Sequence, residues 1–220
     1  MDGRKPNQIL RRGWTTGAYA AATSGAAFKA LLTGQFESPI KILLPKGQKP
    51  EFTLCELKIG SNWAKAGAIK DAGDDPDITH GCKIISEVKK GRKKSGIIFK
   101  SGEGVGTVTL PGLPLKIGEP AINPKPRELI SKVINQIAKE FNAPADLIIT
   151  ISIPNGEILA KKTMNSRLGI IGGLSILGTT GIVIPYSCAS WINSIHRGID
   201  VARAADLNHI VAATGSTSET

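Results

Sequence analysis

The sequence has little cysteine, and its three thiols are widely spaced. Cys55, Cys82 and Cys188 form no C-x-x-C pair. An odd, sparse set of this kind argues against a disulfide framework and a cysteine zinc site, and it is typical of a reducing compartment. Residues 1–14 carry charge with no apolar segment after them, which argues against a signal peptide. We therefore expect a cytoplasmic protein.

Long apolar runs and aromatic residues are also scarce. No apolar stretch approaches the roughly 20 residues of a membrane span, so we expect no association with a membrane. Aromatic residues make up only 5% of the chain, which leaves few rings for stacking on bases and weighs against nucleic acid as a partner. The 41% hydrophobic content over 220 residues suits a globular protein with a real core.

Acidic residues are outnumbered by basic ones. The sequence has 28 Lys and Arg against 18 Asp and Glu, a formal net charge of +10. Such a balance favours an anionic partner, such as nucleic acid, phosphates or a small molecule rich in carboxylates. Solubility alone is the simpler reading, and composition leaves it open. The densest basic run, residues 89–96, is predicted to be an exposed hairpin turn, where a short charge run is usually only solvated.

The first half of the chain is predicted to form a helix followed by β structure. Residues 15–34 are rich in alanine, with Thr15 or Thr16 as the N-cap and Gly34 at the end. Short β-type runs bounded by Gly, Pro and Asn follow at residues 40–45, 52–60, 63–71, 83–90 and 96–110. The glycines of residues 102–108 lack the strand-to-helix context of a dinucleotide motif and indicate a bulged hairpin.

The second half is predicted to alternate helix and strand. Residues 126–141 form a helix whose apolar face consists of Leu129, Val133, Ile134 and Ile137. An apolar strand follows at residues 146–154, then a glycine-rich stretch of loops and turns at residues 167–185. A second helix covers residues 187–205, with apolar positions at Trp191, Ile192, Ile195, Ile199 and Val201.

The end of the sequence bears on domain organisation. Residues 210–213 are predicted to be a strand before a Gly/Ser/Thr turn, which resembles the start of a βα unit whose helix is absent. We therefore expect an α+β domain over residues 1–145, with a mixed or antiparallel sheet and packed helices. Residues 146–220 are expected to begin an α/β region that is truncated.

The segment KDAGDDPDITHG, residues 70–81, places four aspartates within seven residues. An EF-hand needs Gly at its sixth position and Glu at its twelfth, but counting from Asp71 these are Pro76 and Cys82, so we reject that reading. Three readings stay open. The segment is a transition-metal site with His80, a turn whose carboxylates cap backbone amides, or a cleft whose carboxylates bind NH or cationic groups of a ligand.

The segment RRGWTTGAY, residues 11–19, suggests a different kind of site. Thr15, Thr16 and Gly17 begin the predicted helix, where free backbone amides and the positive end of the dipole favour anions. The two preceding arginines add charge-assisted donors, and ordinary capping is the alternative reading. The triplet TTG recurs in residues 175–181, where backbone amides could meet an anion or another chain segment.

Four segments of the sequence together resemble signature segments of one family. They are RRGWTTGAYAAA, KDAGDDPDITHG, GEGVGTVTLPGLPLKIGEPAINPKPRE and LGIIGGLSILGTTGIVIP, in the family's order. The sequence is thereby similar to cobalt-precorrin-5B C1-methyltransferase, the CbiD-type enzyme of anaerobic cobalamin biosynthesis, over residues 11–219. The resemblance implies methyl transfer from S-adenosylmethionine to ring carbon C1 of cobalt-precorrin-5B, giving cobalt-precorrin-6A.

Two features depart from the family pattern. Relatives continue with a C-terminal α/β region after a segment that resembles residues 213–220, where this sequence ends. Tyr19 stands where relatives commonly have smaller residues. If the absent region supplies part of the cofactor pocket, this chain alone is inactive. A non-catalytic fragment and a basic RNA-binding module that uses residues 89–94, with steep salt dependence, therefore stay open as alternatives.

The implied substrate is a tetrapyrrole with many acetate and propionate groups, a polyanion that suits a basic protein. Its cobalt belongs to the substrate, so we expect no metal bound by the protein itself. Methyl transfer depends on in-line approach more than on a nucleophilic side chain. Carboxylates can hold pyrrole NH groups or stabilise positive charge, and a histidine can handle a proton. The expected catalytic residues are Asp71, Asp74, Asp75, Asp77 and His80.

Two further groups of residues are expected to bind the reactants. The substrate-binding residues are cationic side chains and the helix start, namely Arg11, Arg12, Thr15, Thr16, Gly17, Lys70 and Arg127. The residues that bind S-adenosylmethionine lie in two Gly/Thr segments, namely Gly178, Thr179, Thr180, Gly181, Thr214 and Gly215. Self-association into a homo-oligomer stays open.

Overall fold

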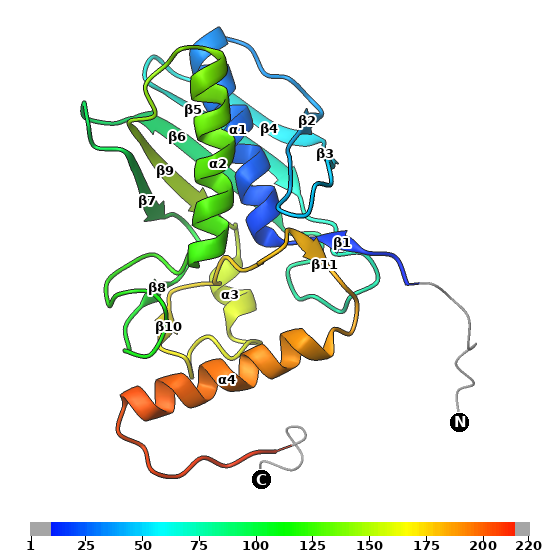
Figure 1. Ribbon diagram of the computed structural model, residues 1–220, viewed down its shortest axis with the longest axis vertical. Coiled ribbons are helices and arrows are strands. Elements are labelled where there is room, and N and C mark those ends of the chain that lie inside the picture. Colours follow the sequence, from blue (N-terminus) through cyan, green and yellow to red (C-terminus); the bar gives the residue numbers. More distant parts are fainter. Residues whose placement is uncertain (1–9, 214–220) are drawn as a thin grey trace.

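The computed structural model describes residues 10–213, and a five-stranded sheet forms its centre (Figure 1). The strand order is β4–β5–β6–β9–β7. Neighbouring strands are antiparallel, except for the parallel pair β7 and β9. The strands are β4 (Leu54–Ile59), β5 (Trp63–Ile69), β6 (Lys83–Lys90), β7 (Ile97–Ser101) and β9 (Leu147–Ser152). The predicted α+β class with a mixed sheet is confirmed.

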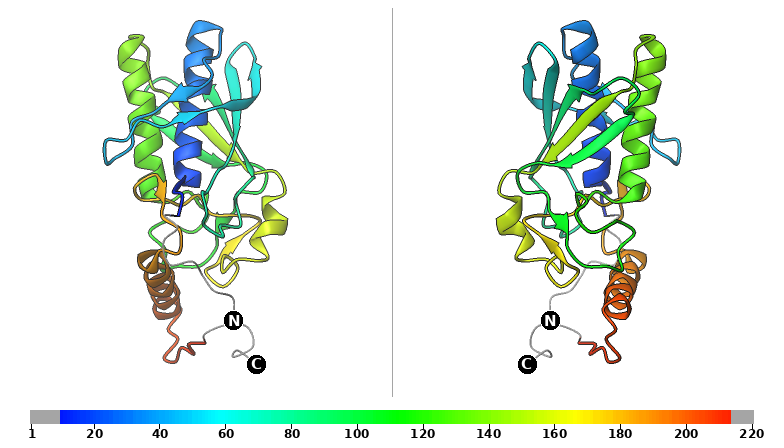
Figure 2. Two further views of the ribbon diagram at one scale, coloured as in Figure 1. Left: turned by 90° about the vertical axis from the view of Figure 1, so that its right-hand side faces the viewer. Right: turned by 90° about the vertical axis from the view of Figure 1, so that its left-hand side faces the viewer.

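Helix α1 (Thr16–Thr33) lies between the sheet and helix α2 (Pro124–Glu140) (Figure 2). It begins at the N-cap Thr15 and ends at the left-handed C-cap Gly34, as predicted. Fourteen of its 18 residues are buried, and most are Ala, Gly, Ser or Thr. These small side chains let the helix backbone come close to β5 and β6 on one side and to α2 on the other.

Helix α2 is amphipathic and covers the outer side of α1. Its predicted apolar face is confirmed, because Leu129, Val133, Ile134 and Ile137 are all buried. The helix starts at Pro124, two residues earlier than predicted, because proline fits the first turn of a helix, where its missing N–H costs nothing. The core between α1, α2 and the sheet is mostly aliphatic, with Phe28 as a buried aromatic residue of α1.

Several short elements complete the fold, and most of them lie at the end where α1 and α2 begin (Figure 1). Strand β1 (Gly13–Trp14) pairs with β11 (Ile182–Val183), which brings the start of α1 beside the glycine-rich stretch. The remaining pairs are β2 (Ile40–Lys41) with β3 (Glu51–Phe52), and β8 (Thr107–Val108) with β10 (Ile170–Ile171). A single helical turn, α3 (Gly156–Ala160), follows β9.

Two predicted hairpins are wrong. Residues 89–96 are largely exposed, as expected, but they do not form a hairpin turn, because β9 lies between β6 and β7 in the sheet. Residues 102–108 do not form a bulged hairpin either, since β8 pairs with β10 rather than with β7. Both errors have the same cause, because strands from later in the chain occupy the neighbouring position.

The C-terminal part agrees with the prediction in its helix and differs in its last strand. Helix α4 (Cys188–Ala204) has the expected extent, but Val201 is its single buried residue. Residues 210–213 are not a strand. The Gly/Ser/Thr turn expected after them lies outside the described residues.

The division of the chain at residue 145 stays a prediction. Strand β9 comes directly after that point and forms ladders with both β6 and β7. Its inward side chains Leu147, Ile149 and Ile151 are part of the core beneath α1. A boundary at residue 145 would therefore separate neighbouring strands of one sheet.

The close contact between α1 and α2 yields a testable prediction. A Cβ added to Gly25 would lie 2.6 Å from Cγ1 of Val133. We expect Gly25→Ala to lower the free energy of unfolding by about 1–3 kcal/mol through overpacking, although alanine is the better helix former. Val133→Ala should cost about 2 kcal/mol by itself, and the double variant less than the sum, as measured by urea unfolding.

The matched control for this prediction is Gly198→Ala in α4. No atom outside its own turn lies within 4 Å of a Cβ at Gly198. This variant should raise the free energy of unfolding by about 0.5–1 kcal/mol. Equal stabilisation by Gly25→Ala would show that α1 and α2 are not packed as described.

Candidate functional site

The acidic segment starts at a buried lysine. Lys70 directly follows β5 and is 1% exposed. Its ammonium pairs with the carboxylate of Asp77 and donates a hydrogen bond of 2.7 Å to Oγ1 of Thr79. Thr79 Oγ1 in turn lies 3.5 Å from Oγ1 of Thr16, the first residue of α1. The buried ammonium thus links the end of β5 to the acidic segment and to the helix start.

Asp77 is ionised to match this lysine. Burial raises the pKa of Asp77, but the charge of Lys70 and the hydrogen bonds from Thr79 outweigh burial and hold the pKa below its usual value. The amide and hydroxyl of Thr79 donate to Oδ1 at 2.7 and 2.6 Å. Both carboxylate oxygens therefore have partners within the protein.

Asp71 forms a bidentate ion pair with Arg11. The two guanidinium-to-carboxylate distances are 2.5 and 2.8 Å. Hydrogen bonding from Arg11 lowers the pKa of Asp71 to about 2, against the opposing effect of burial. Oδ1 of Asp71 also accepts the amide of Gly73 at 2.9 Å. This pair fastens the N-terminal segment to the acidic segment.

The other two aspartates accept backbone amides from distant segments. Oδ2 of Asp74 accepts the Arg11 amide at 2.6 Å, and Oδ1 of Asp75 accepts the Tyr186 amide at 2.9 Å. Capping of amides within the turn, one of the three readings of this segment, is seen at Asp71 and Asp77, which accept the amides of Gly73 and Thr79. A role toward a ligand stays a prediction for all four aspartates.

His80 and Tyr19 also bind the backbone of the acidic segment. Nδ1 of His80 accepts the amide of Ala72 at 3.1 Å, so in the neutral ring the proton is on Nε2. The hydroxyl of Tyr19 accepts the amide of Asp71 at 2.9 Å. Tyr19 is buried on α1, and this contact gives its large side chain a structural purpose that the sequence did not reveal.

The segment with the second TTG triplet, residues 175–181, accepts hydrogen bonds from backbone amides at the start of α1. Gly181 O accepts the Thr15 amide, and Leu177 O accepts the Gly17 amide, both at 2.9 Å. A Cβ on Gly178 would lie 2.3 Å from Oγ1 of Thr15, so only glycine allows this approach. Of the two readings left open for residues 175–181, the structure shows the contact with another chain segment. Anion binding at the helix start stays a prediction.

The two cationic side chains outside the acidic contacts differ in what they bind. Arg127 donates from Nε to Ile122 O at 2.7 Å and from Nη2 to Pro120 O at 3.1 Å, and it also pairs with Glu119. It therefore holds the loop before α2. Arg12 is exposed, and its guanidinium has no ion-pair partner within residues 10–213.

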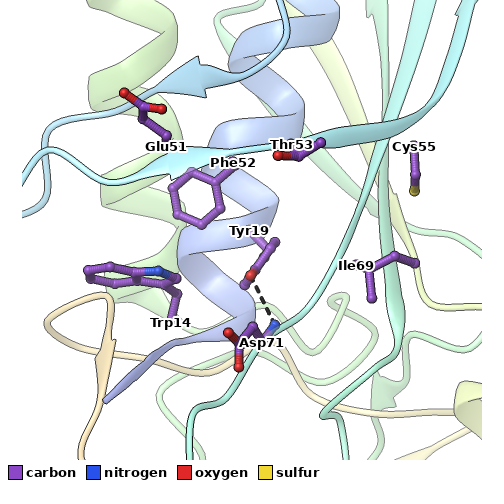
Figure 3. A pocket seen from close by; sticks show the side chains of 8 residues that line it. All are labelled: Trp14, Tyr19, Glu51, Phe52, Thr53, Cys55, Ile69 and Asp71. Atoms are coloured by element: carbon purple, nitrogen blue, oxygen red, sulfur yellow. Dashed lines mark hydrogen bonds between the residues drawn. The ribbon is translucent and has the colours of Figure 1, made fainter. Parts of the chain in front are cut away.

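A hollow of about 340 Å³ lies beside Asp71 (Figure 3). The rings of Tyr19 and Phe52 meet edge to face, with their centroids 4.8 Å apart, and the ring centroids of Trp14 and Phe52 are 6.3 Å apart. The full lining is Trp14, Tyr19, Glu51, Phe52, Thr53, Cys55, Ile69 and Asp71. This lining could not be predicted from the sequence, because Trp14, Tyr19 and Phe52 come from three separate elements.

Most predicted site residues lie together at one end of α1 and α2. Arg11 and the helix start contact the acidic segment there, and residues 178–181 contact the helix start. Arg127 belongs to the same end through Pro126, which lies within 3.2 Å of a Cβ placed on Gly17. Thr214 and Gly215 lie outside the described residues, so their predicted contact with the cofactor has no structural counterpart.

Two simple functional classes gain no support within residues 10–213. No helix there is both long and apolar enough to cross a membrane. No group of three or more His, Cys, Asp or Glu side chains in that range is placed to hold a metal ion. The transition-metal reading of the acidic segment therefore has no ligand set among these residues.

Comparison with known proteins gives one consistent result. The profile of the CbiD family matches residues 3–185. Proteins named cobalt-precorrin-5B C(1)-methyltransferase from Brucella anthropi and Brucella canis are each 59% identical to this chain over 210 residues. The match covers 96% of this chain but 57% of each relative. The chain thus spans a little over half the length of these relatives.

A solved structure agrees with the sequence matches. The crystal structure of the cobalamin biosynthesis protein cbiD from Archaeoglobus fulgidus superimposes with a TM-score of 0.60 at 34% identity. The superposition covers 86% of this chain and 59% of that chain. The α+β arrangement described above is therefore shared with a solved relative.

The Arg11–Asp71 pair predicts a pH dependence. Because the pKa of Asp71 is lowered on folding, its stabilising contribution is complete above about pH 4 and is lost as the pH falls toward about 2. Asp71→Asn should remove this contribution, so its urea midpoint should fall less than the parent's between pH 4 and pH 2. The effect should be modest, since the carboxylate is 44% exposed.

Arg11→Met tests the same pair from its other side. Without the guanidinium the pKa of Asp71 should return toward its ordinary value, and the pH profile should flatten as in Asp71→Asn. Combining the two substitutions should add nothing further to the slope. A parent-like slope in Asp71→Asn would show that this ion pair does not form in solution.

Proposed function

This chain belongs to the CbiD family, and from that premise we propose that it forms part of an enzyme that transfers a methyl group from S-adenosylmethionine to ring carbon C1 of cobalt-precorrin-5B. The product is cobalt-precorrin-6A. The observation that carries the proposal is the 59% identity, over 96% of this chain, to proteins named for this reaction. Because the chain spans 57% of those relatives, the activity is proposed for this sequence together with the region that they carry in addition.

The charge of the chain supports a polycarboxylate substrate. A net charge of +10 attracts a tetrapyrrole with acetate and propionate groups. Arg11 is bound to Asp71, and Arg127 is bound to the loop before α2. Arg12 is exposed beside them and has no ion-pair partner in residues 10–213. It is therefore the side chain we assign to a substrate carboxylate, through a charge-assisted hydrogen bond.

The reaction needs placement more than a nucleophilic side chain. The bond between sulfur and the methyl carbon breaks as the bond to C1 forms, and the sulfur leaves with the electron pair as a neutral thioether. Holding the sulfur, the methyl carbon and C1 in line can lower the barrier by roughly 7–11 kcal/mol at best. The proposed electrostatic role of the acidic segment falls to Asp71, Asp74, Asp75 and Asp77. His80 is proposed to handle a proton through Nε2, since Nδ1 is occupied by the Ala72 amide.

The proposed binding site for S-adenosylmethionine includes residues 178–181. This segment packs against the start of α1, and Thr179 is exposed there. The neighbouring hollow of about 340 Å³ is at the lower end of ligand pockets, which are roughly 300–1,000 Å³. A tetrapyrrole with its side chains is larger than that, so we propose that most of the macrocycle lies outside the hollow. We propose that some of the residues that surround the macrocycle come from the region that full-length family members carry outside the matched residues.

A chimera provides the test of this function. In the Brucella anthropi relative, the 210 matched residues are replaced by the corresponding part of this chain, and methyl-labelled S-adenosylmethionine is supplied with cobalt-precorrin-5B. We expect label to enter the tetrapyrrole. Arg12→Ala should raise KM for the tetrapyrrole roughly tenfold, the loss of one charged hydrogen bond, with kcat little changed.

The matched control is Arg92→Ala, which removes the same charge in the exposed connection between β6 and β7. That connection lies at the opposite end of β6 from Lys70, since Ile69 pairs with Lys83 and Trp63 pairs with Lys89. Equal rises in KM for both variants would show that the effect comes from the net charge of the protein. Arg12 would then not be assigned to the substrate-binding site. A folded chimera that transfers no methyl group would contradict the proposed function.

A further inference from the structure

Helix α4 presents an apolar face that is largely uncovered within residues 10–213. Ile195 lies one helical turn after Trp191 and Ile192 on this face, and the three side chains are 60%, 74% and 52% exposed. Residues 188–197 are all exposed, and the helix crosses the end of the molecule below β8, β10 and α3 (Figure 1). The helix touches the body near its end, where Val201 lies against Gly112.

The contrast with α2 shows how unusual this is. Both helices have 17 residues and one apolar face. In α2 that face is buried against α1, whereas in α4 Val201 is the one buried residue. Most helical stability in proteins comes from packing of the apolar face rather than from the intrinsic preference of the residues. The sequence of α4 is therefore that of a helix with a covering partner.

Exposed apolar side chains also occur in the part of the chain that precedes α4. Nine of the twenty large apolar side chains that are exposed within the described residues belong to residues 177–213. Those that precede α4 are Leu177, Ile184 and Tyr186, with exposures of 51%, 51% and 64%. Monomeric proteins rarely leave apolar patches of this kind uncovered, and larger ones mark interaction sites. We call Leu177, Ile184, Tyr186, Trp191, Ile192 and Ile195 the α4 surface.

We propose that the α4 surface is the contact face for the region that full-length family members carry outside the matched residues. More than two fifths of each Brucella relative and of the Archaeoglobus chain lies outside the match. A region of that size must pack against the matched part if the two form one enzyme. The α4 surface spreads over a helix and the segment before it, which suits a globular partner better than a single helix from a second copy.

Contacts at the edge of this surface connect it to the candidate site. The amide of Tyr186 is bound to Asp75, and Leu177 O accepts the amide of Gly17 at the start of α1. A region docked on the α4 surface would therefore stand next to the acidic segment and the helix start. This placement explains how a hollow too small for a tetrapyrrole is extended into a full site. The proposal rests on family membership and does not depend on the methyl transfer itself.

Hydrogen exchange tests the proposal in the full-length context. We expect amides of residues 188–204 to exchange at least tenfold more slowly in the chimera described above than in the 220-residue chain. The equivalent helix of the intact Brucella anthropi relative should be protected to the same degree, and it supplies the same readout should the chimera fail to fold. Equal exchange in the short and long proteins would overturn the proposal.

Substitutions identify the face that is responsible. Ile192→Asp with Ile195→Asp should abolish the extra protection in the chimera and leave the short chain unchanged, because both side chains are already in water there. The control is Ile158→Asp in α3, a side chain that is 61% exposed and outside the α4 surface. It should leave the protection intact. Equal loss in the control would mean that the added charge, rather than this face, is responsible.

Sedimentation of the 220-residue chain tests whether a second copy of the chain, rather than the additional region, covers the α4 surface. The proposal predicts that any self-association is weak and is the same in the parent and in the Ile192→Asp, Ile195→Asp variant. A stable dimer of the short chain that this variant dissociates would show that a second copy covers the face. Methyl transfer is not measured in any of these experiments, so their failure is distinct from failure of the proposed function.

Discussion

The arrangement of the candidate site depends on one buried charge. The ammonium of Lys70 is almost completely excluded from water, and burial of an unpaired ammonium costs several kcal/mol. Asp77 and Thr79 offset that cost, so the acidic segment must fold back over the end of β5. Thr79 then lies against Thr16, which fixes the segment relative to α1. The remaining contacts of the segment, with Arg11 and with Tyr186, are made from this fixed position.

The family's signature segments are the parts that pack together at this end of the fold. The first segment binds the second through the Arg11–Asp71 pair, and a Cβ on Gly13 would lie 2.0 Å from the carbonyl carbon of Ala72. The last segment binds the first, with Gly178 against Thr15. Backbone contacts this close exclude larger side chains. The acidic segment is thus a scaffold in this structure, and any contact with substrate is an additional task for the same carboxylates.

Local patterns predicted the helices well, because their signals are local. Thr15 and Gly34 cap α1, and the apolar repeat of α2 marks its buried face. The place of β9 between β6 and β7 could not be predicted, since the strand arrives some 50 residues after β7. The exposure of the apolar face of α4 could not be predicted for a related reason, as an apolar stripe indicates that a helix is covered without showing by what. The segments that hold the site residues could be recognised in the sequence. Which residues contact each other could not be predicted, because partners such as Tyr19 and Asp71 are 52 positions apart.

The central claim is that Lys70 and Asp77 hold the acidic segment, the start of α1 and the glycine-rich stretch as one unit. Hydrogen exchange of Asp77→Asn tests it most directly, because this substitution leaves the Lys70 charge buried without its counter-charge. The account predicts that protection falls together in residues 71–81, 12–17 and 177–183. Loss of protection confined to residues 71–81, with the other two segments unchanged, would contradict the claim.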